Sequence, residues 1–332
     1  MKAPAFWAKA PPSLAARLLQ PLGAVYGALT SRRMAQPGAR VSLPVICIGN
    51  FVAGGTGKTP AAMAVAKLLI AEGERVAFLS RGYGGAGTAD PIAVDPKRHA
   101  PDEVGDEPLL LARIAPCFVA RDRLRAAKAA TAAGASVLVL DDGLQNPALV
   151  KDFSLAMIDG VYGFGNGLCL PAGPLRAPPI GQWPHVSMAI VVDAPDRPAK
   201  AWRIVEGKPA IGAKLIPDEA VSEGLRGRNL LAFAGIGRPE KFFATLAALG
   251  ARVALARGFP DHHRFTHREL DALFAETKGR GLTVVTTEKD HVRLPAEYAQ
   301  RTVAVPVTMR FDDEPLIARL LVEAIARRRT SE

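Results

Sequence analysis

Cysteine, acidic residues near the N-terminus and long apolar runs are all scarce in this chain. The 332 residues include three cysteines, which are far apart and form no Cys-x-x-Cys pair. This argues against a disulfide framework or a structural zinc site and fits a reducing compartment. A membrane-spanning helix needs roughly 20 apolar residues, and Arg17 and Gln20 interrupt the apolar N-terminal segment too early for one. The same interruptions argue against a secretory signal peptide.

Aromatic side chains are also scarce, at 6% of the residues, whereas basic side chains are in excess and give a formal net charge of +10. Such a charge favours anionic partners, a group that includes nucleotide phosphates, acidic lipid and nucleic acid. The positive charge is not concentrated in a recognisable nucleic-acid-binding module, and few aromatic rings are available to stack on bases. We therefore expect no nucleic-acid partner.

The first 35 residues combine basic and apolar side chains without any acid, since the first acidic residue is Glu72. Apolar side chains recur there at helical spacing, at Leu14, Leu18, Leu22, Val25 and Leu29. Such a helix can lay its apolar face in a bilayer interface while its arginines meet acidic headgroups. We predict that residues 1–35 form a helical segment that lies on an anionic membrane surface. The alternative is a helix that packs on the protein's own core.

A glycine-rich loop follows the first strand-like segment. The apolar run at 45–48 leads into Gly-Gly-Thr-Gly-Lys-Thr at 54–59 and then into a helical pattern. In such a loop, backbone N–H groups converge on one anion and the helix N-terminus adds positive charge. The pattern predicts a nucleoside triphosphate site in which Lys58 reaches the phosphates and the Thr59 hydroxyl ligates Mg²⁺. Val52 stands where the usual pattern has glycine. The residues assigned to the nucleotide are Gly54, Gly55, Thr56, Gly57, Lys58 and Thr59.

A second strand-like segment, at 137–140, delivers Asp141 and Asp142 to the same predicted sheet edge as the glycine-rich loop. Mg²⁺ takes few protein ligands and keeps several waters, so two carboxylates suffice for it. We predict that both acids lie on or near the metal. A plain Asp-Asp-Gly turn is the alternative interpretation.

Two further loops carry polar side chains near predicted strand or helix ends. Arg81 and Tyr83 lie between glycines in Ser-Arg-Gly-Tyr-Gly-Gly at 80–85, where the backbone can approach a phosphate or a sugar closely. Asp106 opens an apolar helix within Gly-Asp-Glu-Pro at 105–108. A surface turn is the alternative for the first loop, and helix capping is the alternative for the second.

Half of the six histidines cluster at 262–267, where His262 follows an acid in Asp-His-His. A histidine held by a carboxylate is a candidate general base or phosphate partner. Lys289 in Thr-Glu-Lys-Asp at 287–290 follows another predicted strand and can meet an anion, with an exposed turn as the alternative.

Strand-like and helix-like segments alternate along the whole chain. Short, fully apolar strands in βα alternation predict an α/β fold with a mostly parallel sheet and helices on both faces. We expect a core over residues 36–195, a proline-rich linker at 195–198 and a smaller C-terminal α/β lobe with a closing helix over residues 196–332.

Together these motifs resemble the tetraacyldisaccharide 4′-kinase family, the inner-membrane enzymes of lipid A synthesis. The resemblance extends over nearly the whole chain and includes the motifs at 49–60, 80–84, 105–108, 141–145, 170–176, 261–263 and 287–290. The family pattern continues the motif at 170–176 with a glutamate, where this chain has Ala177. Any role of that acid toward metal or nucleotide is therefore in doubt here.

The resemblance implies a P-loop kinase fold whose smaller lobe closes over ATP–Mg²⁺. It implies that Asp106 and His262 act together as the general base that activates the sugar hydroxyl. It also implies that Lys58 contacts the phosphates. The residues it places toward the substrate are Asn50, Arg81, Tyr83, Gln145 and Arg176. It also implies a peripheral enzyme on the cytoplasmic face of the bacterial inner membrane, acting on an acylated glucosamine disaccharide 1-phosphate.

A P-loop ATPase that couples hydrolysis to partner or metal delivery, with no phosphorylated acceptor, is the alternative. Membrane-partitioning ATPases usually carry a lysine just before the Gly-Gly of the loop, and this chain has Ala53 there.

Overall fold

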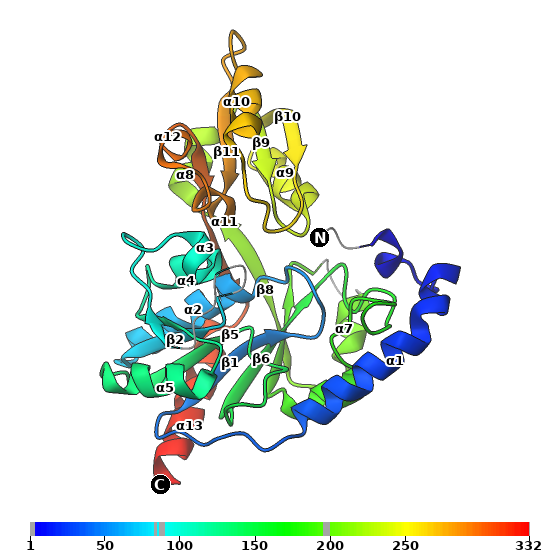
Figure 1. Ribbon diagram of the computed structural model, residues 1–332, viewed down its shortest axis with the longest axis vertical. Coiled ribbons are helices and arrows are strands. Elements are labelled where there is room, and N and C mark those ends of the chain that lie inside the picture. Colours follow the sequence, from blue (N-terminus) through cyan, green and yellow to red (C-terminus); the bar gives the residue numbers. More distant parts are fainter. Residues whose placement is uncertain (1–3, 83–84, 86–89, 195–199, 332) are drawn as a thin grey trace.

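The structure, a computed structural model, describes residues 4–82, 85, 90–194 and 200–331. Its strands form two sheets, a larger one of nine strands and a smaller one of four. Figure 1 shows the smaller sheet standing above the larger one, with the N-terminal helix along one side of the larger unit.

Seven of the nine strands of the larger sheet run parallel, and an antiparallel strand borders each edge. In spatial order the strands are β13 (Val307–Phe311), β8 (Ala210–Pro217), β7 (Met188–Val192), β6 (Phe153–Asp159), β1 (Val45–Asn50), β5 (Val137–Asp141), β2 (Val76–Ser80), β4 (Cys117–Val119) and β3 (Ile92–Ala93). All six residues of β1 are buried, as expected for the central strand of a sheet that is covered on both faces.

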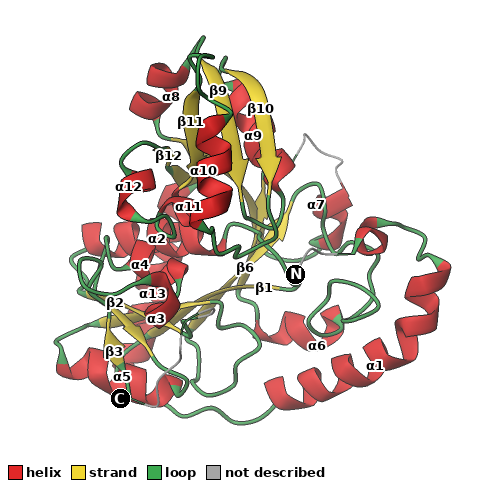
Figure 2. Ribbon diagram, turned by 45° about the horizontal axis from the view of Figure 1, so that its top comes forward, coloured by secondary structure: helices red, strands yellow, loops and turns green. Residues whose placement is uncertain are grey.

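Helices cover both faces of the larger sheet (Figure 2). One face packs against α2 (Lys58–Ala71) and α13 (Glu314–Thr330), and another apolar cluster joins the sheet to α5 (Arg123–Ala132). The remaining helices of this unit are η1 (Ala5–Ala8), α1 (Leu14–Met34), α3 (Pro101–Val104), α4 (Asp106–Leu111), α6 (Pro179–Gln182), η2 (Trp183–His185) and α7 (Lys200–Ile204). The parallel strands leave their carboxyl ends at one edge, where loops build a site.

The smaller sheet is entirely parallel, in the order β10 (Arg252–Gly258), β9 (Asn229–Ala234), β11 (Thr283–Thr287) and β12 (Val303–Val305). Its two faces carry separate apolar clusters, one with α8 (Glu219–Leu225) and α9 (Pro239–Ala248), the other with α10 (His267–Ala275) and α12 (Ala296–Ala299). The short helix α11 (Glu288–His291) follows β11 directly.

The chain passes between the two sheets twice, and the two passages lie side by side. On the way out, β8 ends at Pro217; on the way back, only Pro306 separates β12 from β13. The backbone N–H of Asp218 donates to the carbonyl of Pro306 at 2.9 Å. These two adjacent passages of the chain connect the smaller unit to the larger one.

The division of strands between the sheets differs from the expected ranges of 36–195 and 196–332. Strands β8 and β13 pair with each other in the larger sheet, and α13 packs against α2. The smaller sheet therefore takes its strands from residues 229–305 only. β8 contains Gly212 and ends in proline, so its strand signal in the sequence is weak. The expected linker at 195–198 lies outside the described residues.

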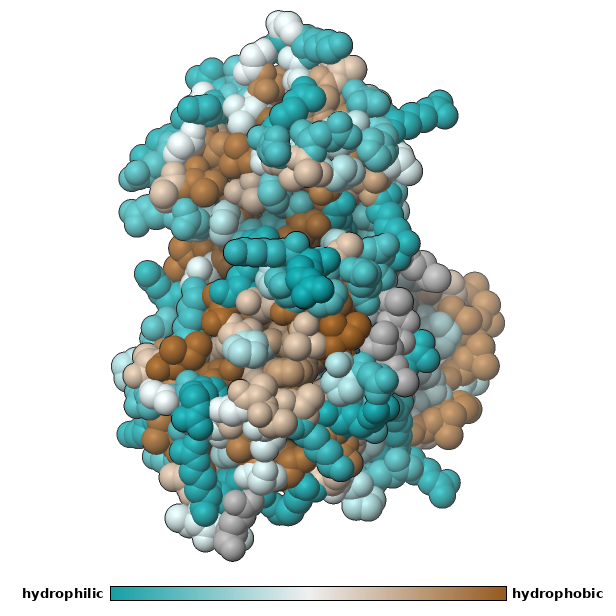
Figure 3. All heavy atoms as spheres, turned by 60° about the vertical axis from the view of Figure 1, so that its left-hand side comes forward, coloured by the Kyte–Doolittle hydropathy of each residue, from teal (hydrophilic) through white to brown (hydrophobic). Residues whose placement is uncertain are grey.

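Helix α1 turns its leucine stripe outward, and its packed face is made of small residues. The side chains of Leu14, Leu18, Leu22, Val25 and Leu29 are between 60% and 74% exposed. Figure 3 shows hydrophobic surface at the edge of the molecule where Figure 1 places α1. Ala16, Gly23, Gly27 and Met34 are the buried residues of the helix. Across the described ranges, no helix is long and apolar enough to cross a bilayer.

The glycines of α1 allow this close contact. A Cβ at Gly23 would lie 2.7 Å from the carbonyl oxygen of Cys169, and a Cβ at Gly27 would lie 2.8 Å from Cys169 Sγ. The helix therefore packs on the protein through its small residues, and its leucine stripe stays exposed.

We predict that Gly23→Val lowers the free energy of unfolding by about 1–3 kcal/mol, because the new side chain must push α1 away from the backbone at Cys169. The matched control is Ala24→Val on the adjacent exposed position, which should change stability by no more than about 0.5 kcal/mol. Thermal unfolding and limited proteolysis of α1 measure both. Equal effects of the two variants would contradict this account of the packing.

Candidate active site

The glycine-rich loop at 51–57 leaves β1 at the carboxyl edge of the sheet and enters α2 at Lys58. Gly57 caps the helix in the left-handed region, with φ 79°, and Gly54 has φ 120°. A Cβ built at Gly54 or Gly55 meets nothing within 4 Å. The loop therefore presents open backbone in front of a helix N-terminus, which is the geometry of a phosphate cradle.

Asp141 ends β5 beside the loop because β5 pairs with β1, with Ile48 opposite Asp141. Its Oδ2 accepts a 3.0 Å hydrogen bond from the Thr59 hydroxyl. Its Oδ1 is buried and has no hydrogen-bond partner within the described part of the chain. Burial, and next the charge of Asp142, raise the pKa of Asp141 to about 7.

The pKa of Asp142, the next residue, shifts in the opposite direction. Its backbone is in the left-handed region, with φ 56°, which is uncommon for a residue other than glycine and occurs often at functional sites. Arg176 donates to both of its carboxylate oxygens, at 2.7 and 2.9 Å, and Lys58 Nζ lies 3.7 Å away. Although burial works to raise the pKa of Asp142, the charges of Lys58 and Arg176 hold it well below its usual range.

This donor set fits a hard divalent cation. Asp141 offers an unpaired buried oxygen next to the Thr59 hydroxyl, and such oxygens are the ligands that Mg²⁺ prefers. Asp142, by contrast, is already neutralised by two basic side chains. The arrangement favours Asp141 as the direct ligand and Asp142 as the group that orients Lys58 and Arg176.

Asn50 and Gln145 brace the loop. The Asn50 amide donates to the Gly54 carbonyl at 3.3 Å and to the Thr56 hydroxyl at 3.0 Å. The Gln145 amide donates to the Asn50 carbonyl and to Gln182 Oε1, each at 2.7 Å. Asn50 is fully buried. These contacts support the loop through its backbone, whereas the family resemblance implied that both side chains face the substrate.

The structure brings Asp106 and His262 together, although they lie 156 positions apart in the sequence. Asp106 begins α4 in the larger unit, and His262 lies in the loop after β10 of the smaller unit, with φ 57°. Nδ1 of His262 is 3.4 Å from Asp106 Oδ1. Arg293 forms an ion pair with Asp106, and Lys289 Nζ lies 3.6 Å from the same carboxylate.

Burial works to raise the pKa of Asp106. The hydrogen bond from His262 and the charges of Lys289 and Arg293 outweigh it and hold that pKa well below its usual range.

Two predicted substrate residues and two residues to which sequence reasoning assigned no role remain to be placed. Arg81 is exposed beside the sheet edge, and Tyr83 lies outside the described residues. Sequence reasoning missed Arg293, which is almost fully buried and also pairs with Asp290 at 2.9 Å. It assigned no role to Glu107, which Lys289 contacts at 2.5 Å. Proximity to Asp106 and to the Lys-Asp motif was the only available signal for these two.

The smaller unit closes directly over the cradle. A Cβ at Gly237, in the loop after β9, would lie 3.6 Å from the backbone N of Gly55. The next residue, Arg238, forms an ion pair with Asp159 at the end of β6. The triphosphate cradle, the acids of β5 and the Asp106–His262 pair therefore all lie where the two units meet.

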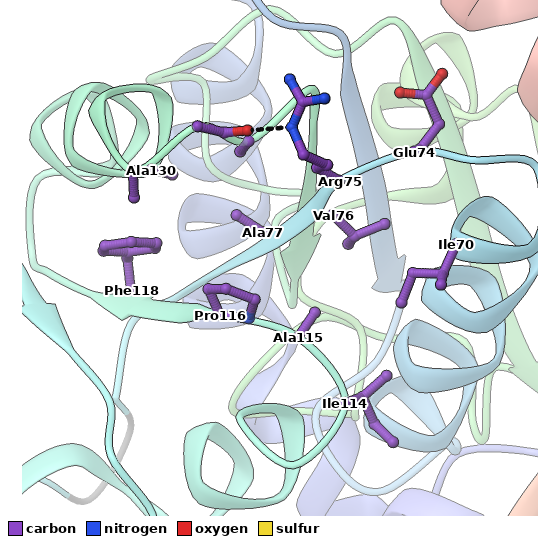
Figure 4. A pocket seen from close by; sticks show the side chains of 13 residues that line it. Ile70, Glu74, Arg75, Val76, Ala77, Ile114, Ala115, Pro116, Phe118 and Ala130 are labelled. Carbon is purple, nitrogen blue, oxygen red and sulfur yellow. Dashed lines mark hydrogen bonds between the residues drawn. The ribbon is translucent and has the colours of Figure 1, made fainter.

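A hollow of about 330 Å³ lies elsewhere, at the opposite edge of the larger sheet (Figure 4). Ile70, Val76, Ile114 and Phe118 line it, and Arg75 Nε donates to the Gly134 carbonyl at 2.6 Å beside it. Because it opens where β2 begins, it is separate from the site at the carboxyl edge.

The raised pKa of Asp141 predicts a pH-dependent response to Mg²⁺. The folded protein keeps a proton that the unfolded chain releases near its ordinary pKa of 3.8, so the metal-free protein loses stability as pH rises from about 4 through about 7. A bound cation offsets this loss. Mg²⁺ without nucleotide should therefore raise Tm more at about pH 8 than at about pH 5.5, and Asp141→Asn should abolish the difference. Equal Tm shifts at both pH values would contradict it.

Comparison with known proteins agrees with this geometry. A family model described as tetraacyldisaccharide-1-P 4′-kinase matches residues 15–326. A protein of Methylobacterium sp. (strain 4-46) named tetraacyldisaccharide 4′-kinase is 56% identical over 323 residues, which cover 96% of this chain and 97% of that protein. A protein of the same name from Methylobacterium radiotolerans is 54% identical over 331 residues, covering 98% and 99%.

Among solved structures, LpxK from Aquifex aeolicus, an "apo" form in complex with ATP, superposes with a TM-score of 0.74. The match covers 94% of this chain and all of that one at 23% sequence identity, so it speaks to the fold. The sequence matches go further, because they are nearly full length and their span, residues 15–326 for the family model, contains all the residues of the site. This chain belongs to the tetraacyldisaccharide-1-P 4′-kinase family.

Proposed function

We propose that this protein transfers the γ-phosphoryl group of ATP to the 4′-hydroxyl of a tetraacylated glucosamine disaccharide 1-phosphate, a step of lipid A biosynthesis. The observation that carries the proposal is the position of the Asp106–His262 pair, which lies across the space between the units from a phosphate cradle. A phosphate cradle alone serves any nucleotide hydrolase. A paired carboxylate and imidazole beside it provide what an alcohol acceptor needs, a group that takes its proton.

The phosphate side of the site stabilises charge. Backbone N–H groups of the loop at 54–57 and the Lys58 ammonium hold the triphosphate. Arg176 pairs with Asp142, the same carboxylate that Lys58 contacts, and adds a second positive charge on this side of the site. Thr59 and Asp141 would hold Mg²⁺, which when bound neutralises charge on the β- and γ-phosphates. Asp142 keeps Lys58 and Arg176 oriented toward that space.

On the acceptor side, the 4′-hydroxyl oxygen forms a bond to the γ-phosphorus as the bond from phosphorus to the β,γ-bridging oxygen breaks, and ADP leaves. The hydroxyl proton passes to the Asp106–His262 pair. His262 orients the carboxylate from the smaller unit, so the pair is assembled only when the two units are together. Phosphoryl transfer is mostly positioning and charge neutralisation, and these groups provide both.

The exposed apolar stripe of α1 fits a substrate with four acyl chains. Each buried CH₂ contributes about 0.8 kcal/mol to membrane binding, so the acceptor stays in the bilayer and the enzyme must come to it. The arginines of the same segment suit an anionic leaflet. We place the protein on the cytoplasmic face of the inner membrane, bound peripherally through α1.

The direct test is incubation with γ-labelled ATP, Mg²⁺ and a tetraacyl disaccharide 1-phosphate, followed by mapping of the label. We expect label on the 4′ position and ADP release that depends on the acceptor. Acceptor-independent ADP release with no labelled lipid would instead support the P-loop ATPase alternative.

Asp106→Asn and His262→Gln should each lower kcat by about 10²–10⁴-fold, the range for a lost general base, and leave ATP affinity nearly unchanged. The matched control is His263→Gln. The ring of His263 stacks on Phe259 and contacts Glu269 at 3.0 Å, away from Asp106, so its loss should cost little. Steady-state kinetics and nucleotide titration separate the effects. A change in nucleotide KM alone would show that the pair binds ATP and that the base lies elsewhere.

Replacing Leu18, Leu22 and Leu29 together by serine should weaken binding to anionic vesicles and lower activity on the acylated acceptor. ATP affinity and Tm should stay close to wild type because these side chains are exposed. Val322→Ser on α13, a partly exposed position on another helix, is the control. Vesicle sedimentation at two salt concentrations measures the effect. Wild-type sedimentation of the triple variant would contradict membrane binding through α1.

A further inference from the structure

Three potential metal ligands converge next to the phosphate cradle. One atom each from Asp106, Glu107 and His262 lies within 4.8 Å of the others, a spacing suited to a metal ion. The centre of this group is taken by a side chain of the chain itself. Lys289 Nζ lies 2.5 Å from Glu107 Oε1, 3.6 Å from Asp106 Oδ2 and 3.3 Å from His262 Nε2. An ammonium group thus sits where a cation would bind.

The contact with His262 determines where that imidazole carries its proton. A lysine ammonium has three donors and no acceptor, so it can only donate to Nε2, which must then be unprotonated. The neutral ring carries its hydrogen on Nδ1, which points at Asp106 Oδ1, 3.4 Å away. Arg293 also lies 3.4 Å from Nδ1, but it donates to Asp290 and Gly235 and pairs with Asp106. The Nδ1–H tautomer alone suits both Lys289 and Asp106.

We propose that Lys289 is a positioning residue that serves as the resident cation of the acceptor-activating pair: it occupies the metal-like position between Asp106, Glu107 and His262 and fixes the Nδ1–H tautomer of His262. The inference rests on the proposed function, because it gives the pair a defined protonation state before the acceptor arrives. It also accounts for how a site with three good metal ligands stays closed to the divalent ion that the neighbouring cradle requires.

The charges around Lys289 support this role. Asp106 and Glu107 face it from α4, Asp261 from the loop after β10, and Asp290 from its own helix, while Lys58 and Arg293 are the nearby cations. Burial works to lower the pKa of Lys289, but Glu107, Asp106 and Asp261 raise it above the ordinary value. The ammonium therefore stays charged in its half-buried position.

The first experiment titrates Zn²⁺ alone into the full-length protein by calorimetry, without ATP or Mg²⁺. We expect Lys289→Met to gain a one-to-one site that the wild type lacks, and the double variant Lys289→Met/Glu107→Gln to lose it. Arg113→Gln is the matched control, because Arg113 bridges to Glu288 at 3.3 Å and is likewise a positive charge that links the two units. It should gain no site. No new site in Lys289→Met would overturn the proposal.

The second experiment compares kinetics. Lys289→Met should lower kcat by about 10²-fold through loss of alignment, with little change in ATP KM. The acid limb of the profile of kcat against pH should move to higher pH in this variant, because removal of the ammonium makes protonation of the Asp106–His262 pair easier. Lys289→Arg keeps the charge, so its acid limb should stay near that of the wild type. An unshifted acid limb in Lys289→Met would show that the lysine is only a structural contact.

The third experiment observes the unaltered protein and uses a variant, His262→Gln, only to assign the signal, so that variant must be folded but need not be active. Nitrogen NMR of the imidazole rings, assigned by the signal lost in His262→Gln, should show unprotonated Nε2 and protonated Nδ1. The opposite tautomer would overturn the proposal. Because neither Zn²⁺ titration nor NMR requires a phosphorylated product, failure of this inference is distinguishable from failure of the proposed kinase activity.

Discussion

The smaller unit meets the larger one through charges of opposite sign, and the site exists only where they meet. The larger unit contributes acids, Asp106 and Glu107 on one side and Asp159 and Asp193 on the other. The smaller unit contributes Lys289 and Arg293 to the first pair, and Arg238 and Lys241 to the second, where Lys241 lies 2.7 Å from Asp193. Two adjacent passages of the chain form the connection between the units. The ion pairs that Lys289 and Arg293 form across the junction are also the ones that lower the pKa of Asp106.

Charged partners also distinguish the two carboxylates on the side of the site where we expect the metal. Asp141 and Asp142 are neighbours, yet the pKa of one is raised and that of the other is lowered. The difference comes from partners: Asp141 is buried with an unpaired oxygen, whereas Asp142 is held by Lys58 and Arg176. A cation at Asp141 would relieve its burial cost. Metal binding at Asp141 therefore depends on the same set of charges that surrounds Asp142.

Local motifs predicted the parts of the site that a single strand and loop can build. The loop at 54–59 and the acids of β5 follow from strand-then-loop patterns, and the parallel register of β1 and β5 brings them together. The Asp106–His262 contact spans 156 residues, and only the family resemblance predicted it. Arg293 was missed, although it follows the Lys-Asp motif closely, because its contact with Asp106 depends on where the two units dock. The division of the sheets was also hidden, since β13 returns to the larger sheet, beside β8, only after the chain has formed the whole smaller sheet. On α1, the leucine stripe was predicted as an exposed face, while the packing through Gly23 and Gly27 depends on backbone closeness that no periodicity reveals.

We propose that the two units hold the triphosphate and the acceptor hydroxyl on opposite sides of their junction. The decisive measurement is a crystal structure of the complex with a non-hydrolysable ATP analogue, Mg²⁺ and the tetraacyl disaccharide 1-phosphate. We expect the γ-phosphate over the loop at 54–59, and the 4′-hydroxyl in line with it and within about 2.6–3.2 Å of the Asp106–His262 pair. A 4′-hydroxyl bound away from that pair, with the nucleotide in place, would contradict it.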